Sequence, residues 1–531
     1  MPQGTTSNHV NHQSPLSRQT TNGAATNGPA TDGGRLGTDV RVVGVELYFL
    51  PVETRVPLKF GSETLTSVTC ARVRVTVEDR RGRTAVGWGE TPLNVEWVWP
   101  SSTPYRDRYQ ITLDFCKRLA KRWADFQVSG HPMEIGHAFQ QLVLGDEIET
   151  VNKPVAEELK IPLLAGLLCC SPFDIAIYDA FGNLHGMPAM EMLTKDFCSS
   201  DLASFLNQDS AANDEFDFKG LYPADFIRTQ RLPTLPAWHL VGGLDSLSPE
   251  ELNGNAVNDG HPEVLSDWIK RDGLRCLKIK LRGVDYEWDY DRLVRIGQVA
   301  QAGGVTHLTA DFNCTVNDPQ YVVDIMDKLA RDQPRVYDSL LYIEQPFPYD
   351  LEKHQIDVRA VSDRKPLLMD ESAHNWELVR LGRSLGWTGV ALKTCKTLTG
   401  ALLSLCWAKA HGMCLMVQDL TNPMLAQIPH LTLAAYTETL MGVETNGMQF
   451  YPEASRIEAE VHPGIYCRRE GQVDLSTLGE TGFGYRVDEI NRKLPAPAFS
   501  QRASIGEECH GVPAPHIKVP LTAKEPHATN E

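Results

Sequence analysis

Residues 276–280 read C-L-K-I-K, a short apolar segment that ends in a charged side chain. This pattern decides the fold because it recurs down the chain, in segments that end at Val241, Asp311, Glu344, Asp370, Lys393, Gln418 and Glu444. From Lys280 onward the segment ends follow one another at intervals of 23 to 33 residues. Helix-period stretches lie between them, at 290–301, 321–329, 377–385, 401–410 and 425–436. Buried strands that alternate with helices at this spacing predict a (β/α) barrel in the α/β class.

An open, doubly wound sheet is the alternative architecture for the same alternation of strands and helices. Nearly every predicted strand here ends in a charged or polar residue. An open sheet does not require that, whereas a barrel gathers the carboxyl ends of all its strands around one active site. The pattern therefore favours the barrel.

The residues before the predicted barrel show a different pattern of apolar residues. Residues 41–50, 67–78 and 84–90 are β-branched or alternating and predict antiparallel strands, with D-R-R-G-R as a hairpin turn between the last two. Helical spacing follows at 109–126, 132–144 and 167–184. A strand meander followed by helices predicts an N-terminal α+β domain.

The domain boundaries follow from composition. Residues 1–38 are rich in Asn, Thr, Gly and Ser and predict a disordered tail, because they offer little apolar surface to bury. We place the α+β domain at 39–235 and the barrel at 236–465. A segment at 466–494 is predicted to return to the α+β domain, and 495–531 to form a second flexible tail. The region 197–236 lacks a clear period and predicts an enlarged N-terminal domain.

The composition excludes several classes of protein. The 531 residues carry a formal net charge of −17, whereas nucleic-acid binding needs a basic surface. We find no apolar run near the ~20 residues of a membrane span and no secretory signal, so no membrane partner is expected. The 12 cysteines form no C-x-x-C pair, which is typical of reduced thiols in a cytoplasmic protein.

Three predicted strands in succession end in the carboxylates Asp311, Glu344 and Asp370. In a barrel these side chains would converge, and their mutual repulsion would raise each other's pKa. A hard divalent cation resolves that repulsion, and Mg²⁺ prefers carboxylate oxygens. The sequence therefore predicts a Mg²⁺ site, with Mn²⁺ as a substitute.

Lysines flank the three carboxylates in strand order. Lys278 and Lys280 share one face of their strand, because side chains alternate with period two, and Lys393 ends a strand on the other side. Two lysines that face the interior would be costly in a purely structural core. Lys396 lies beyond its strand, in a turn, and is predicted to be solvated.

These motifs together resemble the enolase superfamily and, within it, the muconate-lactonising subgroup. L-K-I-K (277–280), D-F-N (311–313), I-E-Q-P-F (343–347), D-E-S (370–372) and L-K-T-C-K (392–396) are similar to the motifs at the ends of that family's second to sixth strands. The run at 171–188 is similar to the helix that closes its capping domain. The resemblance covers roughly residues 40–490. It implies a modified TIM barrel of (β/α)7β type with an N-terminal capping domain.

The chemistry expected of this site is removal of a proton α to a carboxylate. Mg²⁺ would stabilise the resulting enediolate as a Lewis acid. Lys280 would act as the base, Lys278 as the neighbouring charge that lowers its pKa, and Lys393 would work from the opposite face. The residues expected to contact substrate are Asn313, Glu444, Asn446 and, from the cap loops, Lys59. Trp97 and Trp99 are predicted either to line the substrate site or to pack in the core.

Two departures limit the resemblance. The seventh strand, L-M-V-Q-D-L-T-N-P, has no His, and the sixth carries Lys rather than Asp, unlike the branch that includes many acid-sugar dehydratases. E-T-N-G (444–447) stands where dipeptide epimerases of the subgroup show D-x-D. We therefore expect a racemase, epimerase or cycloisomerase acting on a small carboxylate, as a homo-oligomer. An acid-sugar dehydratase and a catalytically silent acid-binding protein are the alternatives.

Overall fold

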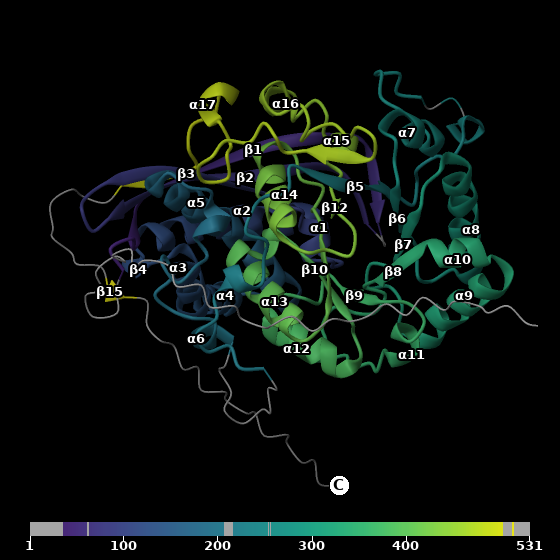
Figure 1. Cartoon of the computed structure of the whole chain (residues 1–531), viewed down its shortest axis with the longest axis horizontal. Coiled ribbons are helices and arrows are strands. Elements are labelled where there is room, and N and C mark those ends of the chain that lie inside the picture. The colour runs from purple at the N-terminus through teal and green to yellow at the C-terminus, as the bar shows by residue number, and fades with distance from the viewer. Residues whose placement is uncertain are drawn as a thin grey trace, which may run out of the picture.

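The computed structural model describes residues 36–60, 63–206, 216–252, 254, 256–502 and 512–513. The predicted disordered tail at 1–38 lies outside this range except for its last three residues. Most of the predicted tail at 495–531 also lies outside it. Figure 1 shows an N-terminal domain, with purple strands, beside a barrel whose elements run from teal to green.

The N-terminal domain is an antiparallel sheet covered by helices. Its strands are β1 (Val40–Phe60), β2 (Glu63–Asp79), β3 (Thr84–Pro92), β4 (Val128–Gly130) and β15 (Val512–Pro513), in the order β15-β4-β1-β2-β3. Its helices are α1 (Val95–Val98), α2 (Tyr105–Ala124), α3 (Pro132–Phe139), the π-helix η1 (Gln140–Leu144), α4 (Gly145–Asn152), η2 (Glu157–Leu159), α5 (Leu163–His185) and η3 (Ala189–Met192). The predicted strands and helices of this domain all appear, with shifted ends.

Helix α5 packs directly on β3 because two glycines leave room for it. A Cβ atom on Gly87 would lie 2.1 Å from the amide nitrogen of Ala180, and one on Gly89 would lie 2.0 Å from the carbonyl oxygen of Pro172. By length and apolar composition the helical span Glu157–His185 could cross a membrane, so the expectation of no such run was wrong. Its apolar window is 89% buried inside the protein, and it therefore serves as the central helix of this domain.

Eight parallel strands form the barrel. They are β5 (Thr234–Val241), β6 (Cys276–Lys280), β7 (His307–Asp311), β8 (Leu340–Glu344), β9 (Leu367–Met369), β10 (Gly389–Leu392), β11 (Cys414–Val417) and β12 (Val443–Glu444). They pair in the order β11-β10-β9-β8-β7-β6-β5-β12, and a parallel bridge between Gln418 and Glu444 joins the two ends of that order. The predicted capped, modified TIM-barrel fold is confirmed.

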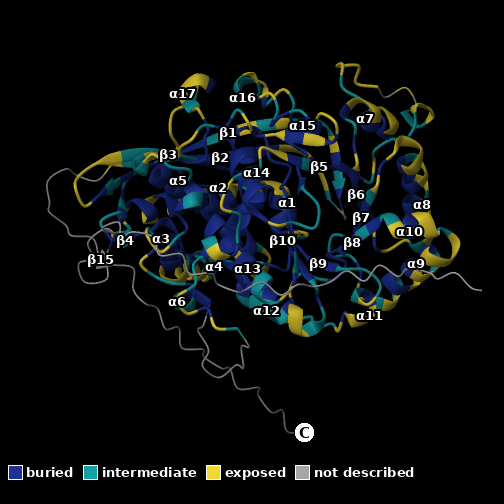
Figure 2. Ribbon diagram, viewed as in Figure 1, coloured by how far each residue is buried: buried dark blue, intermediate teal, exposed yellow. Residues whose placement is uncertain are grey.

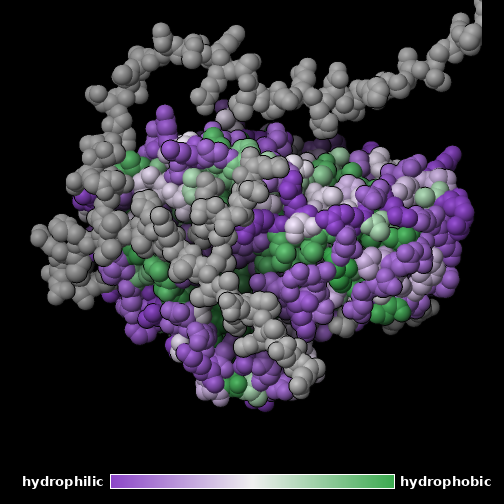
Figure 3. All heavy atoms as spheres, turned by 90° about the horizontal axis from the view of Figure 1, so that it is seen from below, coloured by the Kyte–Doolittle hydropathy of each residue, from purple (hydrophilic) through white to green (hydrophobic). Residues whose placement is uncertain are grey.

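Helices surround the barrel. They are α7 (Leu265–Asp272), α8 (Tyr286–Gly303), α9 (Pro319–Asp332), α10 (Pro334–Ser339), α11 (Arg359–Ser362), α12 (Trp376–Leu385), α13 (Leu398–Ala410) and α14 (Gln427–Tyr436). Two of them, α13 and α14, are buried on nearly all sides. Shorter pieces are η5 (Pro249–Leu252), η6 (Thr394–Lys396), η7 (Met424–Ala426), α15 (Gly447–Phe450) and α16 (Arg456–Val461). Figure 2 shows buried strands at the centre and exposed outer faces on α8 to α11. The face in Figure 3 is mostly hydrophilic with scattered apolar patches.

The C-terminal segment runs from the barrel to the N-terminal domain. Strand β13 (Gln472–Asp474) pairs with β5, and the amide of Phe483 then donates to Asp179 of α5 at 2.8 Å. Helix α17 (Val487–Ile490) follows. Strand β14 (Phe499–Arg502) pairs with β1 over Gly44–Leu47. The prediction of a flexible tail from 495 was therefore wrong for this strand, because backbone pairing with an open sheet edge orders it without a large apolar face.

The region 197–236 was predicted to enlarge the N-terminal domain, and it contacts both that domain, where Ser199 Oγ donates to Glu134 of α3 at 2.7 Å, and the barrel. Its described part includes α6 (Ala203–Leu206) and η4 (Pro223–Asp225), and it packs on the outside of the barrel. The amide of Arg228 donates to the carbonyl of Tyr436 at 2.7 Å, and Lys409 of α13 donates to the carbonyl of Phe226 at 3.0 Å. The segment therefore covers α13 and α14.

Candidate functional site

Lys278 and Lys280 project from β6 into the carboxyl-terminal mouth of the barrel. The Lys278 ammonium lies 2.6 Å from Glu344 Oε1, 2.9 Å from Glu444 Oε2 and 3.1 Å from Asp311 Oδ2. Burial lowers the pKa of Lys278, but these three carboxylates outweigh burial and hold it well above its usual value. Lys278 is therefore an ammonium ion. Lys280 donates to Asp311 Oδ2.

The carboxylates Asp311, Glu344 and Asp370 lie on three consecutive strands, at most 1% exposed. Sheet register aligns the first two with Lys280, since Lys280 pairs with Asp311 and Asp311 with Glu344. Asp370 follows β9 directly. Burial and the neighbouring Asp311 and Asp370 raise the pKa of Glu344 to about 8, against the opposing effect of Lys278. Parallel pairing thus brings the three predicted carboxylates into one arc.

Lys393 follows β10 and faces the other end of that arc. Its ammonium lies 3.2 Å from Asp370 Oδ2 and donates to the carbonyl of Asp419 at 2.9 Å. Burial lowers the pKa of Lys393, and Asp370 raises it by more, so the net shift is upward. Strands β6 and β10 are four apart in the eight-stranded order. Lys280 and Lys393 therefore approach the mouth from opposite sides of the barrel.

Lys396 was predicted to be solvated, and this was wrong. It is 3% exposed, lies 3.3 Å from Asp370 Oδ1 and also donates to the Asp370 carbonyl. The turn η6 explains the error, because residues three apart eclipse in a 3₁₀ turn and Lys396 falls on the side of Lys393. The spacing K-x-x-K at a strand end was the available signal.

Glu371 belongs to the site although its role was not predicted. Its Oε1 accepts from Trp97 Nε1 at 3.0 Å and from Asn313 Nδ2 at 3.1 Å. Its Oε2 is buried and has no hydrogen-bond partner among the described residues. Burial and the nearby Asp370 and Asp311 raise the pKa of Glu371 to about 7. Asn313 thus contacts the site through Glu371, and Trp97 joins the cap to it.

Gln345 ties the ends of β8 and β9 together and was also not singled out. It is fully buried, with a φ of 31°. Its Oε1 accepts from the amides of Asp370 at 2.7 Å and Ser372 at 3.2 Å, and from Ser372 Oγ at 2.8 Å. The Gln345 side chain therefore positions Asp370 relative to Glu344.

Strands β11 and β12 complete the ring. Glu444 accepts from Lys278 and from Asn446 Nδ2, the latter at 2.8 Å. Asp419, which the sequence reasoning missed, accepts from the Asn446 amide at 2.7 Å and the Asn422 amide at 3.2 Å. Asn446 Oδ1 accepts from the Leu240 amide at 3.0 Å. Asn446 is thus a connector whose polar atoms are engaged within the protein.

Lys59 is the predicted residue that the structure leaves apart. Its neighbours on β1, Leu58 and Phe60, line the cavity between the two lysines, together with Trp97 and Leu240. Side chains alternate along a strand, so Lys59 points away from that cavity. The Gly243 amide donates to its carbonyl at 3.1 Å.

The cluster fits a divalent cation by charge and by donor type. Six buried carboxylates face four buried ammonium groups: Asp311, Glu344, Asp370, Glu371, Asp419 and Glu444 against Lys278, Lys280, Lys393 and Lys396. Only with all ten groups ionised are two negative charges in excess, and burial together with repulsion among the carboxylates raises the pKa values of Glu344 and Glu371 when no cation is bound. Carboxylate oxygens are the ligands that Mg²⁺ prefers. Within the described residues no three acidic, His or Cys side chains are grouped at metal-ligating spacing. The four lysines hold the oxygens of Asp311, Glu344 and Asp370 instead.

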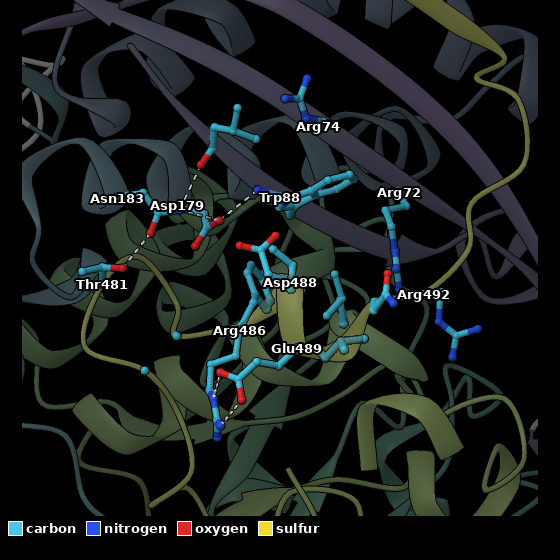
Figure 4. A pocket seen from close by; sticks show the side chains of 18 of the residues that line it. Arg72, Arg74, Trp88, Asp179, Asn183, Thr481, Arg486, Asp488, Glu489 and Arg492 are labelled. Atoms are coloured by element: carbon cyan, nitrogen blue, oxygen red, sulfur yellow. Dashed lines mark hydrogen bonds and ion pairs between the residues drawn. The ribbon is translucent and has the colours of Figure 1, made fainter. Parts of the chain in front are cut away.

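A cavity of about 670 Å³ lies elsewhere, between β2, β3 and the C-terminal segment (Figure 4). Its buried acid, Asp179, accepts from the amides of Trp88 at 2.9 Å and Phe483 at 2.8 Å. Arg486 is paired with Glu489, and Arg492 with Glu458. Asp179 thus joins the C-terminal segment to β3, and the two arginines pair with acids of that segment and of α16. These groups hold the chain together, so the chemistry points to the barrel mouth rather than to this larger cavity.

Comparison with known proteins gives the following similarities. Residues 263–491 match a family model described as "Enolase C-terminal domain-like". No curated protein matches the chain in sequence. Among solved structures, the N-succinyl Arg/Lys racemase from Bacillus cereus ATCC 14579 is 15% identical, with a TM-score of 0.54, over 87% of this chain and 99% of that chain.

Two further structures are similar over comparable lengths. The dipeptide epimerase from Enterococcus faecalis V583, complexed with Mg and L-Leu-L-Tyr, is 16% identical with a TM-score of 0.53, over 84% of this chain and 99% of that one. The muconate lactonizing enzyme from Pseudomonas Fluorescens, complexed with muconolactone, is 15% identical with a TM-score of 0.52, over 84% and 96%. At these identities the likeness establishes the fold.

Proposed function

We propose that the protein is an enzyme of the enolase type, because residues 263–491 match the family model described as "Enolase C-terminal domain-like". The proposed reaction is removal of the proton α to the carboxylate of a small substrate, with Mg²⁺ as cofactor. A racemase, epimerase or cycloisomerase outcome fits this reaction. Homo-oligomeric assembly and a cytoplasmic location stay predictions.

One observation carries the proposal. Lys280 and Lys393 reach the barrel mouth from strands four apart in the eight-stranded order, and the arc of Asp311, Glu344 and Asp370 lies on the strands between them. A substrate α-carbon placed against that arc would have one amine on each side. Two amines on opposite sides suit transfer of a proton away from one face and back to the other.

The surroundings of each lysine determine whether it carries a proton. Lys393 is an ammonium because Asp370 raises its pKa despite burial, so it is poised to donate a proton. Lys278 is an ammonium held by three carboxylates and stays charged. Lys280 lies two residues after Lys278 on the same face of β6 and donates to Asp311 Oδ2, and we assign it the role of the base on the side of the mouth opposite Lys393.

The residues that would hold Mg²⁺ are Asp311, Glu344 and Asp370, with Gln345 positioning the third. When bound, the ion would offset the repulsion among the three carboxylates and stabilise the charge that develops on the substrate carboxylate. The fold of the compared enzymes, one of them crystallised with Mg, supports this assignment.

Exchange of substrate α-hydrogen with deuterated solvent tests the proposal. A library of carboxylic acids incubated with the protein and Mg²⁺ should contain acids that gain deuterium at the α-carbon. Removal of Mg²⁺ by a chelator should abolish this gain. The double variant Lys280→Ala/Lys393→Ala should also abolish it, whereas Lys117→Ala, an exposed lysine of α2, should not. Exchange that persists in the double variant would refute the role of the lysines.

A further inference from the structure

The cavity between the two lysines has an apolar wall on one side. Its volume is about 30 Å³. From the cap, Leu58 and Phe60 of β1 and Trp97 of α1 line it, and from the barrel Leu240 of β5 and Leu420, in the loop after β11, do so. These five side chains are 3–7% exposed and belong to one hydrophobic cluster, which continues into the core of the N-terminal domain.

The cap brings no charged side chain to this cavity. Leu58, Phe60, Asn94 and Trp97 are the cap residues among its described lining, and Lys59 points the other way. All of the charged residues that line it come from the barrel: Lys278, Lys280, Asp370, Lys393, Asp419 and Glu444. A charge on the far end of a substrate would therefore be buried without a partner, which is strongly unfavourable.

Several polar atoms near the apolar wall are already engaged. Asn94 Oδ1 accepts from the Trp97 amide at 3.1 Å, as the N-cap of α1. Trp97 Nε1 donates to Glu371, and both carboxylate oxygens of Asp419 accept from Asn446. Hydroxyl groups of a substrate in this region would lose hydrogen bonds to water and find few replacements.

We propose that the substrate is a carboxylic acid whose substituent beyond the α-carbon is apolar, either aliphatic or aromatic. This inference rests on the proposed function and adds the substrate class to it. The carboxylate would lie against the barrel charges, and the substituent would lie against Leu58, Phe60 and Trp97. Sugar acids, with several hydroxyls, and acids with a charged side group are disfavoured by the same contacts.

The cavity is too small for a substrate in this structure, but the residues that line it are still mostly apolar on the cap side. About 30 Å³ accommodates little more than one water molecule. The β1–β2 hairpin must therefore move outward to admit any substrate, and Leu58 and Phe60 move with it. In the structure Leu58 and Phe60 occupy the face of β1 that lines this cavity.

Solvent exchange with two sets of acids tests the substrate class. The apolar set is 2-phenylpropanoate and 2-methylbutanoate, and the polar set is gluconate and glutamate, each with Mg²⁺ in deuterated buffer. We expect kcat/KM for exchange to be at least about 10-fold higher for the apolar set, the usual scale when buried hydroxyls go unpaired. Exchange of the polar set alone would overturn the substrate class and leave the proposed function standing. If no acid of either set exchanges, and no acid of a wider library exchanges either, both the substrate class and the proposed function are overturned.

Two neighbouring substitutions on β1 refine this test. Phe60→Gln places an amide on the wall and should reduce the preference for the apolar set by about 10-fold. Lys59→Gln, on the opposite face, should retain the preference, and loss of it there would contradict the assignment of the wall. Isothermal titration calorimetry measures the affinity of the wild-type protein for the same four acids and needs no variant. Tighter binding of gluconate than of 2-phenylpropanoate would also overturn the inference.

Discussion

Arg55 of β1 donates hydrogen bonds to both carboxylate oxygens of Asp259, which lies on the barrel loop between β5 and α7. The same guanidinium donates to the carbonyls of Pro262 at 3.2 Å and His261 at 3.3 Å. The Arg55 side chain is 6% exposed, and that of Asp259 is 32% exposed. This pair fastens the hairpin that carries Leu58 and Phe60 to the barrel.

We predict that Arg55→Ala loosens the hairpin. Four hydrogen bonds are lost, so the amides of residues 51–60 should exchange with deuterated water at least about 10-fold faster. Hydrogen exchange followed by mass spectrometry measures this. Arg41→Ala, which removes a different ion pair of the same strand with Glu78, is the matched control and should leave these amides unchanged. Equal protection in Arg55→Ala and the wild type would show that the pair does not hold the hairpin.

Strand β14 covers an edge of β1 that would otherwise be open. A chain that ends at Leu494 lacks this strand and exposes backbone groups of residues 44–47. Unpaired strand edges promote association between chains. We expect this truncation to aggregate on heating at a lower temperature than a chain that ends at Pro513, as measured by light scattering. The same aggregation temperature for both chains would contradict the role of β14.

His131 is predicted to make the protein sensitive to acid. Burial lowers its pKa to about 3, and its neutral ring caps α3 by accepting from the Met133 amide at 3.1 Å. Below pH 6.5 the unfolded chain binds a proton that the folded chain excludes, so stability falls as the pH drops. From pH 8 to pH 5 this costs about 2 kcal/mol in the free energy of unfolding.

His131→Asn isolates that contribution, because Asn keeps an oxygen that can cap the helix. The variant should lose about 2 kcal/mol less than the wild type between pH 8 and pH 5. Urea unfolding at the two pH values measures the difference, and other titrating groups cancel in the comparison. Parallel pH dependence of the two proteins would show that His131 is protonated in the folded state.

Metal binding should depend on the carboxylate arc. Asp370→Asn removes one negative charge and one ligand oxygen, so Mg²⁺ affinity should fall by at least about 10-fold. Isothermal titration calorimetry of the chelator-treated protein measures this. Asp350→Asn, an exposed acid on the loop after β8, is the control and should bind as the wild type does. An unchanged isotherm in Asp370→Asn would exclude Asp370 from the ligands.

The strand ends could be predicted from sequence because each is a local pattern. A short apolar run that stops at a charged residue marks both the strand and the mouth of the barrel, as at Lys280, Asp311 and Glu344. The order of these residues along the chain then gives their order around the barrel, since consecutive parallel strands joined by helical connections lie next to each other.

What could not be predicted depends on contacts between distant segments. Glu371 belongs to the site partly through a hydrogen bond from Trp97 of the cap, which lies far away in the sequence. The direction of the Lys59 side chain depends on the register of β1, and a shift of one residue would turn that side chain to the opposite face. Lys396 is buried by a turn that the alternation of strands does not reveal. Strand β14 is ordered by backbone pairing with β1, and its amino-acid composition does not predict this pairing.

The central claim is that Lys280 and Lys393 serve opposite faces of one α-carbon, and one measurement tests it most directly. Each enantiomer of an exchanging acid is incubated separately in deuterated buffer with Lys280→Ala and with Lys393→Ala. We predict that each variant loses exchange of one enantiomer by at least about 100-fold and retains exchange of the other, with the two variants complementary. Equal loss of both enantiomers in both variants would contradict the account and leave one lysine as an electrostatic stabiliser.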